Sequence, residues 1–430
     1  LYSFSFAKYR NSGIRYPDQP DILSYLKSVA DDFGIRPHLC LNTPIKSAIW
    51  DNESRLWTLT TESGEVHKAR VAIFAVGQLH RSFTPEIKGH QAFKGASFHT
   101  AEWDHSVNLA GKNVAVIGSG SSAAQLIPHV ARIANRLDVY QRTPNWVIPK
   151  PGPQFGKTTK WLFDRMPPLQ TAFRGLVWLG ADVGLTPVIS RGWSARPIEW
   201  IARWHLRRQI VNPELRQKLT PTYTIGCKRI VIDSNFYPAL NRENVAVITN
   251  PVKAISATGI TTDDAVRRKV DVIVYATGFR TTEFLVPIDI RGRDGASLHE
   301  RWKSGAEAFM GLALPEFPNM FMLHGPNTIL GHNSNVFIIE QQVRYVMKCL
   351  KLLRDQKKPY DHPIELTDQA MEEYKSWLEK KVGGTVWLEN CRSWYKTPEG
   401  RVVNPWPEST RYYRRMARRN PAEVFQQINN

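Results

Sequence analysis

The chain has 430 residues, of which 42% are hydrophobic and 22% charged, so it can bury sizeable cores and is not a disordered tail protein. Lysine and arginine outnumber aspartate and glutamate by 57 to 39, and the net charge of +18 indicates an anionic partner: nucleic acid, a membrane surface or a phosphorylated ligand. Four scattered cysteines exclude a disulfide scaffold and a cysteine metal site, and they favour a reduced, cytoplasmic setting.

The first hundred residues are typical of a mixed α/β segment. Apolar residues at helical spacing predict a helix over 21–33. An alternating segment, 47–61, and an apolar run that ends at Gly77 predict strands. The segment 93–104 is interpreted as a glycine-containing connection that carries His99. A histidine in such a place is more often a hydrogen-bonded structural residue than a catalyst.

A strand, a glycine turn and a helix follow one another between residues 112 and 133. Gly118 permits a tight turn, Gly120 lets the backbone approach a pyrophosphate, and Ala123 keeps the helix close to the strand. The N-terminus of the helix supplies N–H donors for an anion. We therefore predict a dinucleotide site here, although a plain strand–helix turn can carry the same pattern.

The end of the next strand, 137–141, bears on which dinucleotide is bound. An NAD site places an acidic residue there for the ribose 2′-hydroxyl, but this chain continues with Arg142 and Thr143. Arg142 can pair with a 2′-phosphate, which a carboxylate would repel. NADP is favoured, and an exposed arginine after a strand remains the alternative.

The rest of the chain alternates between helical and strand-like segments. Residues 150–220 are rich in tryptophan, proline and arginine and show no strand signal. Apolar runs at 245–248 and 270–278 predict buried strands. Two amphipathic helices are predicted, one from about Ile339 and one after Thr367, which is a suitable N-cap.

The surplus of basic residues gathers in two places, and neither contains a recognised nucleic-acid module. The first cluster is Arg191, Arg196, Arg203, Arg207, Arg208, Arg216 and Lys218, and the second is Arg411, Arg414, Arg415, Arg418 and Arg419. The first lies among tryptophans, which indicates either docking at a membrane interface or a helical cap over an apolar substrate tunnel. We expect peripheral membrane contact, no nucleic acid and no transmembrane helix, since the nearest apolar run, 172–189, is interrupted by Arg174 and Asp182.

Segment 93–104 also carries a family resemblance. Phe93-x-Gly95-x-x-x-His99-Thr100-x-x-Trp103-Asp104 resembles the fingerprint of Baeyer–Villiger monooxygenases, a branch of the flavin-dependent monooxygenases. Further segments are similar to segments of that family, and they follow one another along the chain in the same order as in the family. They are 141–146, 271–279, 325–341 and 393–395.

The resemblance implies an α/β fold with two doubly wound Rossmann-like domains, one for FAD and one for NADPH, and a helical insertion. The corresponding ranges are 1–108 and 269–430 for the FAD domain and 109–268 for the NADP domain, with the insertion at about 150–225. In this family NADPH reduces the flavin, O2 adds to give a peroxyflavin, and one oxygen atom enters an apolar ketone to give an ester or lactone. Oxygenation of nitrogen or sulfur through the same species stays open. A basic membrane- or nucleic-acid-binding protein with a vestigial nucleotide fold is the alternative of another class.

The resemblance also implies roles for individual residues, and no metal ligands. Arg229 matches the active-site arginine, Lys228 the lysine that reaches the NADP 2′-phosphate, and Trp394 a tryptophan that contacts the nicotinamide nucleotide. Without the resemblance, Lys228 and Arg229 would be interpreted as a surface charge pair, and Trp394 as a core or interface aromatic residue. Cofactor-binding positions are Gly118, Ser119, Gly120, Ser121, Ser122, Ala123, Gln125, Arg142, Thr143, Lys228, Trp394, Ile45, Thr277 and Gly278. The connecting motif, a possible hinge, comprises Phe93, Gly95, His99, Thr100, Trp103 and Asp104.

The sequence departs from the family's pattern at its start. The pattern has an early GxGxxG for the FAD pyrophosphate, an acidic residue and an active-site aspartate, and none of these occurs here. We therefore expect the first FAD-binding βαβ unit to lie upstream of Leu1. Without that unit, the remaining sheet would have an unpaired edge.

Overall fold

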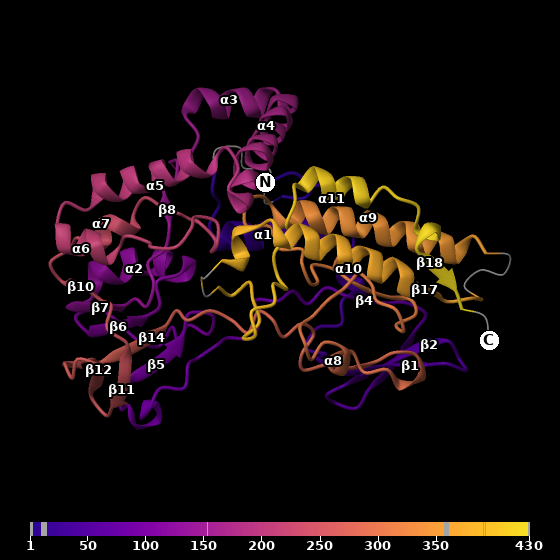
Figure 1. Ribbon diagram of the computed structural model, residues 1–430, viewed down its shortest axis with the longest axis horizontal. Helices are drawn as coiled ribbons and strands as arrows, with labels where there is room; N and C mark the ends of the chain where they lie inside the picture. The colour runs from indigo at the N-terminus through magenta and orange to yellow at the C-terminus, as the bar shows by residue number, and fades with distance from the viewer. Residues whose placement is uncertain are drawn as a thin grey trace.

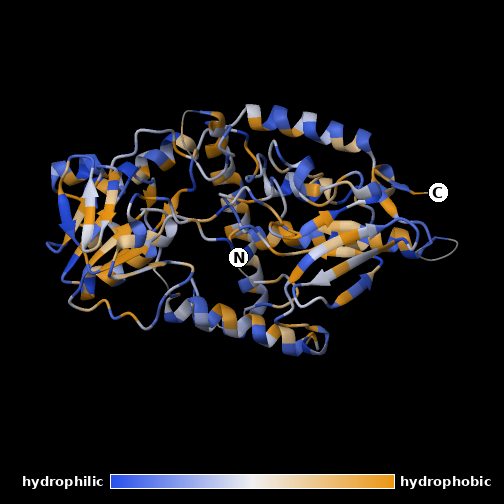
Figure 2. Ribbon diagram, turned by 90° about the horizontal axis from the view of Figure 1, so that it is seen from below, coloured by the Kyte–Doolittle hydropathy of each residue, from blue (hydrophilic) through white to orange (hydrophobic). Residues whose placement is uncertain are grey.

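The computed structural model describes residues 3–9, 15–152, 154–356, 361–389, 391 and 393–428. These residues form two lobes that lie side by side (Figure 1). We call the lobe built on a five-stranded sheet the nucleotide lobe. The other, which contains residues 45–74 and most of 284–428, is the C-terminal lobe. Apolar residues gather in the strands of the nucleotide lobe and in the interior of the C-terminal lobe (Figure 2).

The nucleotide lobe rests on a parallel sheet with the strand order β10-β7-β6-β14-β5. Its strands are β5 (Ala96–His99), β6 (Asn113–Ile117), β7 (Arg136–Tyr140), β10 (Val245–Ile248) and β14 (Val272–Tyr275). Val114 and Val116 pack into the core shared with α2 (Ser121–Ile133) and α7 (Phe236–Leu240). Ala115 and Ile117 belong to the core on the opposite face. Because both faces are covered, these strands are nearly continuous apolar runs, as predicted.

Two features of this lobe differ from the predictions. Segment 93–104 contains strand β5, which pairs with β14, so the sheet extends beyond the predicted boundaries 109 and 268 at both ends. The opposite face is covered by an antiparallel sheet that the sequence analysis missed. It comprises β11 (Val252–Ser256), β12 (Gly259–Thr262) and β13 (Arg267–Lys269). These strands are short and partly charged, so they lack an apolar run to signal them.

A helical segment lies between β8 (Val147–Ile148) and its parallel partner β9 (Val231–Ile232). Its helices are α3 (Lys157–Arg165), α4 (Pro167–Leu185), the 3₁₀ helix η3 (Thr186–Ser190), α5 (Ala195–Gln209) and α6 (Pro213–Lys218). The described residues of 150–220 contain no strand, as predicted. In Figure 1, α3 and α4 rise above the two lobes.

The C-terminal lobe combines a four-stranded sheet with long helices. The sheet has the order β15-β1-β2-β3, with β1 (Ile45–Asp51), β2 (Leu56–Thr61), β3 (Val66–Ala69) and β15 (Asp289–Arg291). The alternating segment 47–61 is therefore a hairpin, whose turn includes Arg55 at a φ of 55°. Helix α1 (Gln19–Asp32) confirms the first predicted helix.

Strand β4 (Ala72–Phe74) pairs in parallel with β16 (Met320–Met322), and among the described residues these two strands pair with no others. Ala72 and Phe74 are buried, whereas the side chain between them, Ile73, is 46% exposed. One face of this short sheet is therefore uncovered.

Three helices cover the other side of the lobe: α9 (Asn335–Arg354), α10 (Asp368–Gly383) and α11 (Thr410–Met416). The first two confirm the predicted amphipathic helices. The Thr367 hydroxyl accepts the Ala370 N–H at 3.2 Å, so the predicted N-cap is also confirmed. The remaining α-helix and strands are α8 (Leu298–Arg301), β17 (Ile364–Leu366) and β18 (Phe425–Gln427).

Candidate functional site

The two glycines of the turn after β6 are required for different reasons. Gly118 has a φ of 114°, and a Cβ there would overlap the carbonyl oxygen of Ala276 at the end of β14. Gly120 precedes α2 as its N-cap, and a Cβ there would meet no atom within 4 Å. Gly118 is therefore fixed by packing, whereas Gly120 borders open space into which a ligand can approach.

The residues around this turn form a cradle at the N-terminus of α2. Ser119 donates its hydroxyl to the Thr143 carbonyl at 3.3 Å, and the Asn145 amide donates to the Ser119 carbonyl at 2.6 Å. Ala123 is fully buried against the sheet. Ser121, Ser122 and Gln125 are exposed on the first turns of the helix. The positive end of the helix dipole thus faces an accessible cradle, which suits a pyrophosphate.

Two cations lie beside this cradle without an acidic partner among the described residues. Arg142 is exposed directly before Thr143, and Lys228 is half-buried with its Nζ 4.8 Å from the Tyr223 ring centre. Burial, and then the nearby Arg142 charge, lower the pKa of Lys228 to about 8. Two adjacent cations without a carboxylate suit a phosphate dianion, so these residues fit the 2′-phosphate of NADP.

Arg229 lies where three distant segments meet. It is half-buried, and it forms no ion pair within the described part of the chain. Burial raises the pKa of the neighbouring Tyr395 to about 12, and the Arg229 charge opposes that rise. A Cβ added at Gly331, just before α9, would lie 3.1 Å from the Tyr395 hydroxyl. Arg229 therefore lies near the C-terminal segment, and through Tyr395 near the entry to α9.

The loop that carries Arg229 is fastened to the C-terminal segment by three contacts. Cys227 and Cys391 form a disulfide across 164 residues of sequence. The Thr224 hydroxyl donates to Glu389, and the Trp387 Nε1–H donates to the Gly226 carbonyl at 3.1 Å.

The expectation of reduced cysteines is therefore wrong for one pair. Cys227 and Cys391 are so distant in sequence that only the fold brings them together. Cys40 and Cys349 are free. The cytoplasmic setting inferred from the cysteines stays a prediction.

Trp394 joins the same assembly. Its ring centre lies 4.6 Å from that of Tyr395, and its backbone carbonyl accepts hydrogen bonds from Thr281 at 2.8 Å and Asn404 at 2.6 Å. The half-buried indole is therefore held in a fixed position beside the Arg229 loop. This placement is consistent with contact to a nucleotide as well as with a packing role.

Buried side chains in the C-terminal lobe and in the connection that follows β4 have polar atoms without a hydrogen-bond partner among the described residues. Neither ring nitrogen of His332 nor either amide atom of Gln78 has a hydrogen-bond partner among the described residues. Burial lowers the pKa of His332 to about 4, so its ring is neutral at pH 7. Buried polar groups are rarely left unsatisfied, so this region fits a polar cofactor such as FAD.

The connecting motif lies at the β5 edge of the nucleotide-lobe sheet rather than in the cradle. His99 is buried at the end of β5, with its ring 5.7 Å from that of Phe279, and its Nδ1 accepts the Ala101 N–H at 3.1 Å. Burial lowers the pKa of His99. These contacts support the structural interpretation of this histidine.

The other motif residues have local packing or turn-forming roles. The Thr100 N–H donates to the Tyr275 carbonyl at 2.9 Å, and Trp103 packs edge-on against Phe98 at 4.9 Å. Asp104 accepts both the N–H and the hydroxyl of Ser106, which forms a turn. A Cβ at Gly95 would overlap the Asp271 carbonyl and the Phe93 ring.

Thr277 and Gly278 lie where the two connections between the lobes run side by side. The Thr277 hydroxyl donates to the Phe83 carbonyl, and the Phe83 N–H donates to the Gly278 carbonyl at 2.9 Å. Gly278 has a φ of 89°, and a Cβ there would meet no atom within 4 Å. Ile45 begins β1, in the separate sheet of the C-terminal lobe, and is thus not brought into the cradle.

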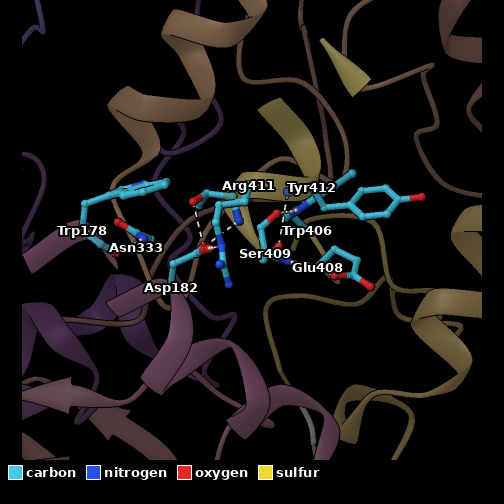
Figure 3. A network of polar contacts seen from close by, with 9 residues as sticks. Trp178, Asp182, Asn333, Trp406, Glu408, Ser409, Arg411 and Tyr412 are labelled. Carbon is cyan, nitrogen blue, oxygen red and sulfur yellow. Dashed lines mark hydrogen bonds and ion pairs between the residues drawn. The ribbon is translucent and has the colours of Figure 1, made fainter. Parts of the chain in front are cut away.

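The sequence analysis names Asp182 only as a charge that interrupts an apolar run, and its structural role was not predicted. Asp182 on α4 is fully buried, and it accepts hydrogen bonds from the Thr410 N–H and hydroxyl, each at 2.7 Å, and from Arg411 Nε at 2.9 Å (Figure 3). The signal was present, because a carboxylate inside an apolar helix must be paired when it is buried. This network fastens the helical segment to the C-terminal lobe.

The geometry indicates a class of protein: one that binds a dinucleotide in a cradle at a helix N-terminus and carries further buried polar groups without protein partners. A profile of the family described as pyridine nucleotide-disulphide oxidoreductase matches residues 7–156. A Baeyer-Villiger monooxygenase of Pseudomonas aeruginosa is 37% identical over 99% of this chain and 80% of its own length. A phenazine N-monooxygenase of Lysobacter antibioticus is 30% identical over 92% of this chain and 79% of its own length.

Solved structures of monooxygenases are also similar to this chain. Cyclohexanone monooxygenase from Rhodococcus sp. Phi1, bound to NADP+, is similar with a TM-score of 0.86 and 26% identity, over 97% of this chain and 86% of its own. The structure of OTEMO in complex with FAD and NADP has the same TM-score and identity, over the same shares of the two chains.

The chain belongs to the flavin-binding monooxygenase family, of the Baeyer–Villiger type. It is a monooxygenase that depends on FAD and NADPH, with the α/β fold of cyclohexanone monooxygenase. The alternative hypothesis of a non-enzymatic basic protein with a vestigial nucleotide fold is therefore wrong.

Proposed function

We propose that this enzyme inserts one oxygen atom of O2 into an apolar ketone, next to the carbonyl carbon, and forms an ester or lactone. The second oxygen atom leaves as water, and NADPH supplies the two electrons. Bound FAD would supply the activation of O2. The observation that carries the proposal is Arg229, a half-buried guanidinium without an acidic partner among the described residues, at the meeting point of both lobes.

The chain's own residues have separable tasks in this reaction. The cradle at Gly118–Ala123 binds the NADPH pyrophosphate, and Arg142 with Lys228 selects the 2′-phosphate. Arg229 stabilises negative charge that develops at the reacting oxygen, because its guanidinium keeps its charge at any working pH. Tyr395 and Trp394 close the site toward the C-terminal segment and exclude water from it.

A panel test addresses this function directly. The protein is supplied with NADPH, O2 and a series of cyclic, linear and aromatic ketones, and products are identified by mass spectrometry. We expect an amount of ester or lactone that is proportional to the NADPH oxidised above the rate measured without ketone. The absence of such products from the entire panel would contradict the proposal.

Oxygenation of nitrogen or sulfur is the second candidate. The relative from Lysobacter antibioticus is named a phenazine N-monooxygenase, so the family includes this reaction. An amine and a sulfide are therefore included in the panel. N-oxide or sulfoxide as the sole product would favour this candidate over the ketone reaction.

We also propose peripheral contact with a membrane surface. The net charge of +18 and the basic, tryptophan-rich helical segment support such contact, since anionic lipids attract clustered lysine and arginine.

A further inference from the structure

Helix α4 turns its apolar side chains outward and its charged side chains toward the protein. Its charged residues, Arg174 and Asp182, point inward together with Trp178, at a spacing of four residues. Its other face carries Leu169, Phe173, Leu176, Leu179 and Val183, which are all exposed and follow one another three or four residues apart. Helices of soluble proteins usually show the opposite arrangement, and an exposed apolar stripe marks an interaction surface.

The inward face of α4 is fixed by specific contacts. The Arg174 guanidinium donates to the Ser3 carbonyl at 2.7 Å, and the Trp178 carbonyl accepts the Asn333 amide at 3.1 Å. Asp182 is held by Thr410 and Arg411, and Figure 3 shows Asp182 beside Arg411. The helix therefore cannot rotate to bury its apolar face without breaking a buried charged network, which is costly.

Basic residues flank the apolar face. Helix α3 precedes α4 directly and carries Lys157, Lys160 and Arg165 at its exposed surface, against the single acid Asp164. Beyond η3, helix α5 exposes Arg196, Arg207 and Arg208 together with tryptophans. Trp193 and Trp200 are 70% and 66% exposed, and exposed indoles of this kind are enriched at membrane–water interfaces.

We propose that the outward face of α4, flanked by α3 and α5, is the surface with which this enzyme docks on an anionic lipid bilayer; this rests on the membrane contact proposed above. The helix lies in the plane of the interface, with Leu169, Leu176 and Leu179 inserted among the acyl chains and the lysines and arginines at the headgroups. Phe173 instead packs against Phe155 and Phe163 and holds α3 against α4. By length and composition, Pro167–Ser190 is the one described helical stretch that could cross a membrane. The inward contacts of Asp182 and Arg174 instead keep it against the protein and parallel to the bilayer.

Charge favours a lipid surface over a second copy of the chain. Two copies that met through this face would bring together two molecules of net charge +18, with the basic residues of α3 and α5 near their counterparts. An anionic bilayer neutralises the same residues. In Figure 1 the α3–α4 pair rises above the lobes, so it can reach a flat surface.

Vesicle flotation tests the docking surface. The protein is mixed with vesicles of phosphatidylcholine alone or with added phosphatidylglycerol, at low and at high salt. The parent protein is expected to float with the anionic vesicles and to bind them more weakly at high salt. The double variant Leu176→Glu/Leu179→Glu is expected to bind at least about tenfold more weakly, because two inserted apolar side chains are lost.

A matched control separates the stripe from a general effect of added negative charge. Leu39 and Leu41 are 47% and 74% exposed in a loop outside the helical segment, compared with 40% for Leu179 and 67% for Leu176. Leu39→Glu/Leu41→Glu adds the same two charges and is expected to bind vesicles as the parent does. Retained NADPH oxidation in solution shows that the variants are folded, since none of these side chains belongs to the nucleotide site. This readout also distinguishes a failure of docking from a failure of the proposed oxygenation.

Each other outcome overturns the proposal. If the parent protein binds no anionic vesicles, both the membrane contact and its surface are wrong. If the double variant binds like the parent, the membrane contact stands and α4 is not the surface. If sedimentation without lipid shows a dimer that Leu176→Glu dissociates, the face joins two copies of the chain.

Discussion

The glycine turn of the nucleotide lobe and the Arg229 loop are both needed for the same reaction, but they are held in place by different means. The turn is built by a strand and a helix that are adjacent in sequence, β6 and α2, and one distant residue, Ala276, packs closely against Gly118. The Arg229 loop has no regular structure and is fastened to residues 387–391 by a disulfide and two hydrogen bonds. The shape of the cofactor site therefore comes mainly from elements that are adjacent in sequence, whereas the site of chemistry depends on long-range contacts alone.

The largest expected effect lies in the Arg229 loop. Arg229→Ala should lower ester formation by roughly 10²–10³-fold, because a preorganised charged donor is removed from the reacting centre. Flavin reduction by NADPH should continue, since the cradle is intact. Product yield per NADPH consumed measures this uncoupling. Arg196→Ala, on the exposed surface of α5, is the control, and normal product yield from Arg229→Ala would refute the assigned role.

The glycine turn can be broken in two distinct ways. Gly118→Ala should cost roughly 2–4 kcal/mol of folding stability, because it combines a left-handed φ with an overlap with the Ala276 carbonyl. Gly120→Ala should cost about 1 kcal/mol or less and instead raise the KM for NADPH, since its Cβ enters only the open cradle. Urea unfolding and NADPH kinetics separate the two. Equal effects on stability would show that the turn is not fixed by packing.

Arg142→Ala sharpens the choice of cofactor. It should raise the KM for NADPH by about 10–100-fold, because one or two charge-assisted hydrogen bonds are lost. The KM for NADH should stay nearly unchanged. Lys112→Ala is a matched control, because Lys112 is exposed at the opposite end of β6. Equal losses with both nucleotides would mean that Arg142 does not contact the 2′-phosphate.

The smallest expected effect is a pH dependence at Lys228. Its pKa of about 8 means that the ammonium is charged below pH 8 and neutral above it. The KM for NADPH should therefore rise by roughly a few-fold as the pH increases through 8, whereas that for NADH should not. Lys228→Arg should remove this rise, because arginine keeps its charge. An unchanged pH profile in Lys228→Arg would assign the titration to another group.

The sequence by itself determined the elements whose residues signal their own structure. The apolar strands at β6, β7, β10 and β14, the glycine turn and the Thr367 cap were all predicted, because buried parallel strands and capped helices are encoded over short distances. The charged strands β11–β13 and the short strand β5 were not predicted, since their pairing depends on a neighbour elsewhere in the chain. The family resemblance supplied roles that no local pattern could give.

Only the tertiary structure decided how the site of chemistry is assembled and which face of α4 is outward. The sequence shows Cys227, Cys391, Glu389 and Trp387 as unrelated residues, and their contacts exist only once the chain folds back over more than 150 positions. It also shows α4 as an apolar run with two charges, which is equally compatible with a buried helix. The direction in which Asp182 points, toward Thr410 and Arg411, turns that run into an exposed apolar surface, because a buried carboxylate must face its partners.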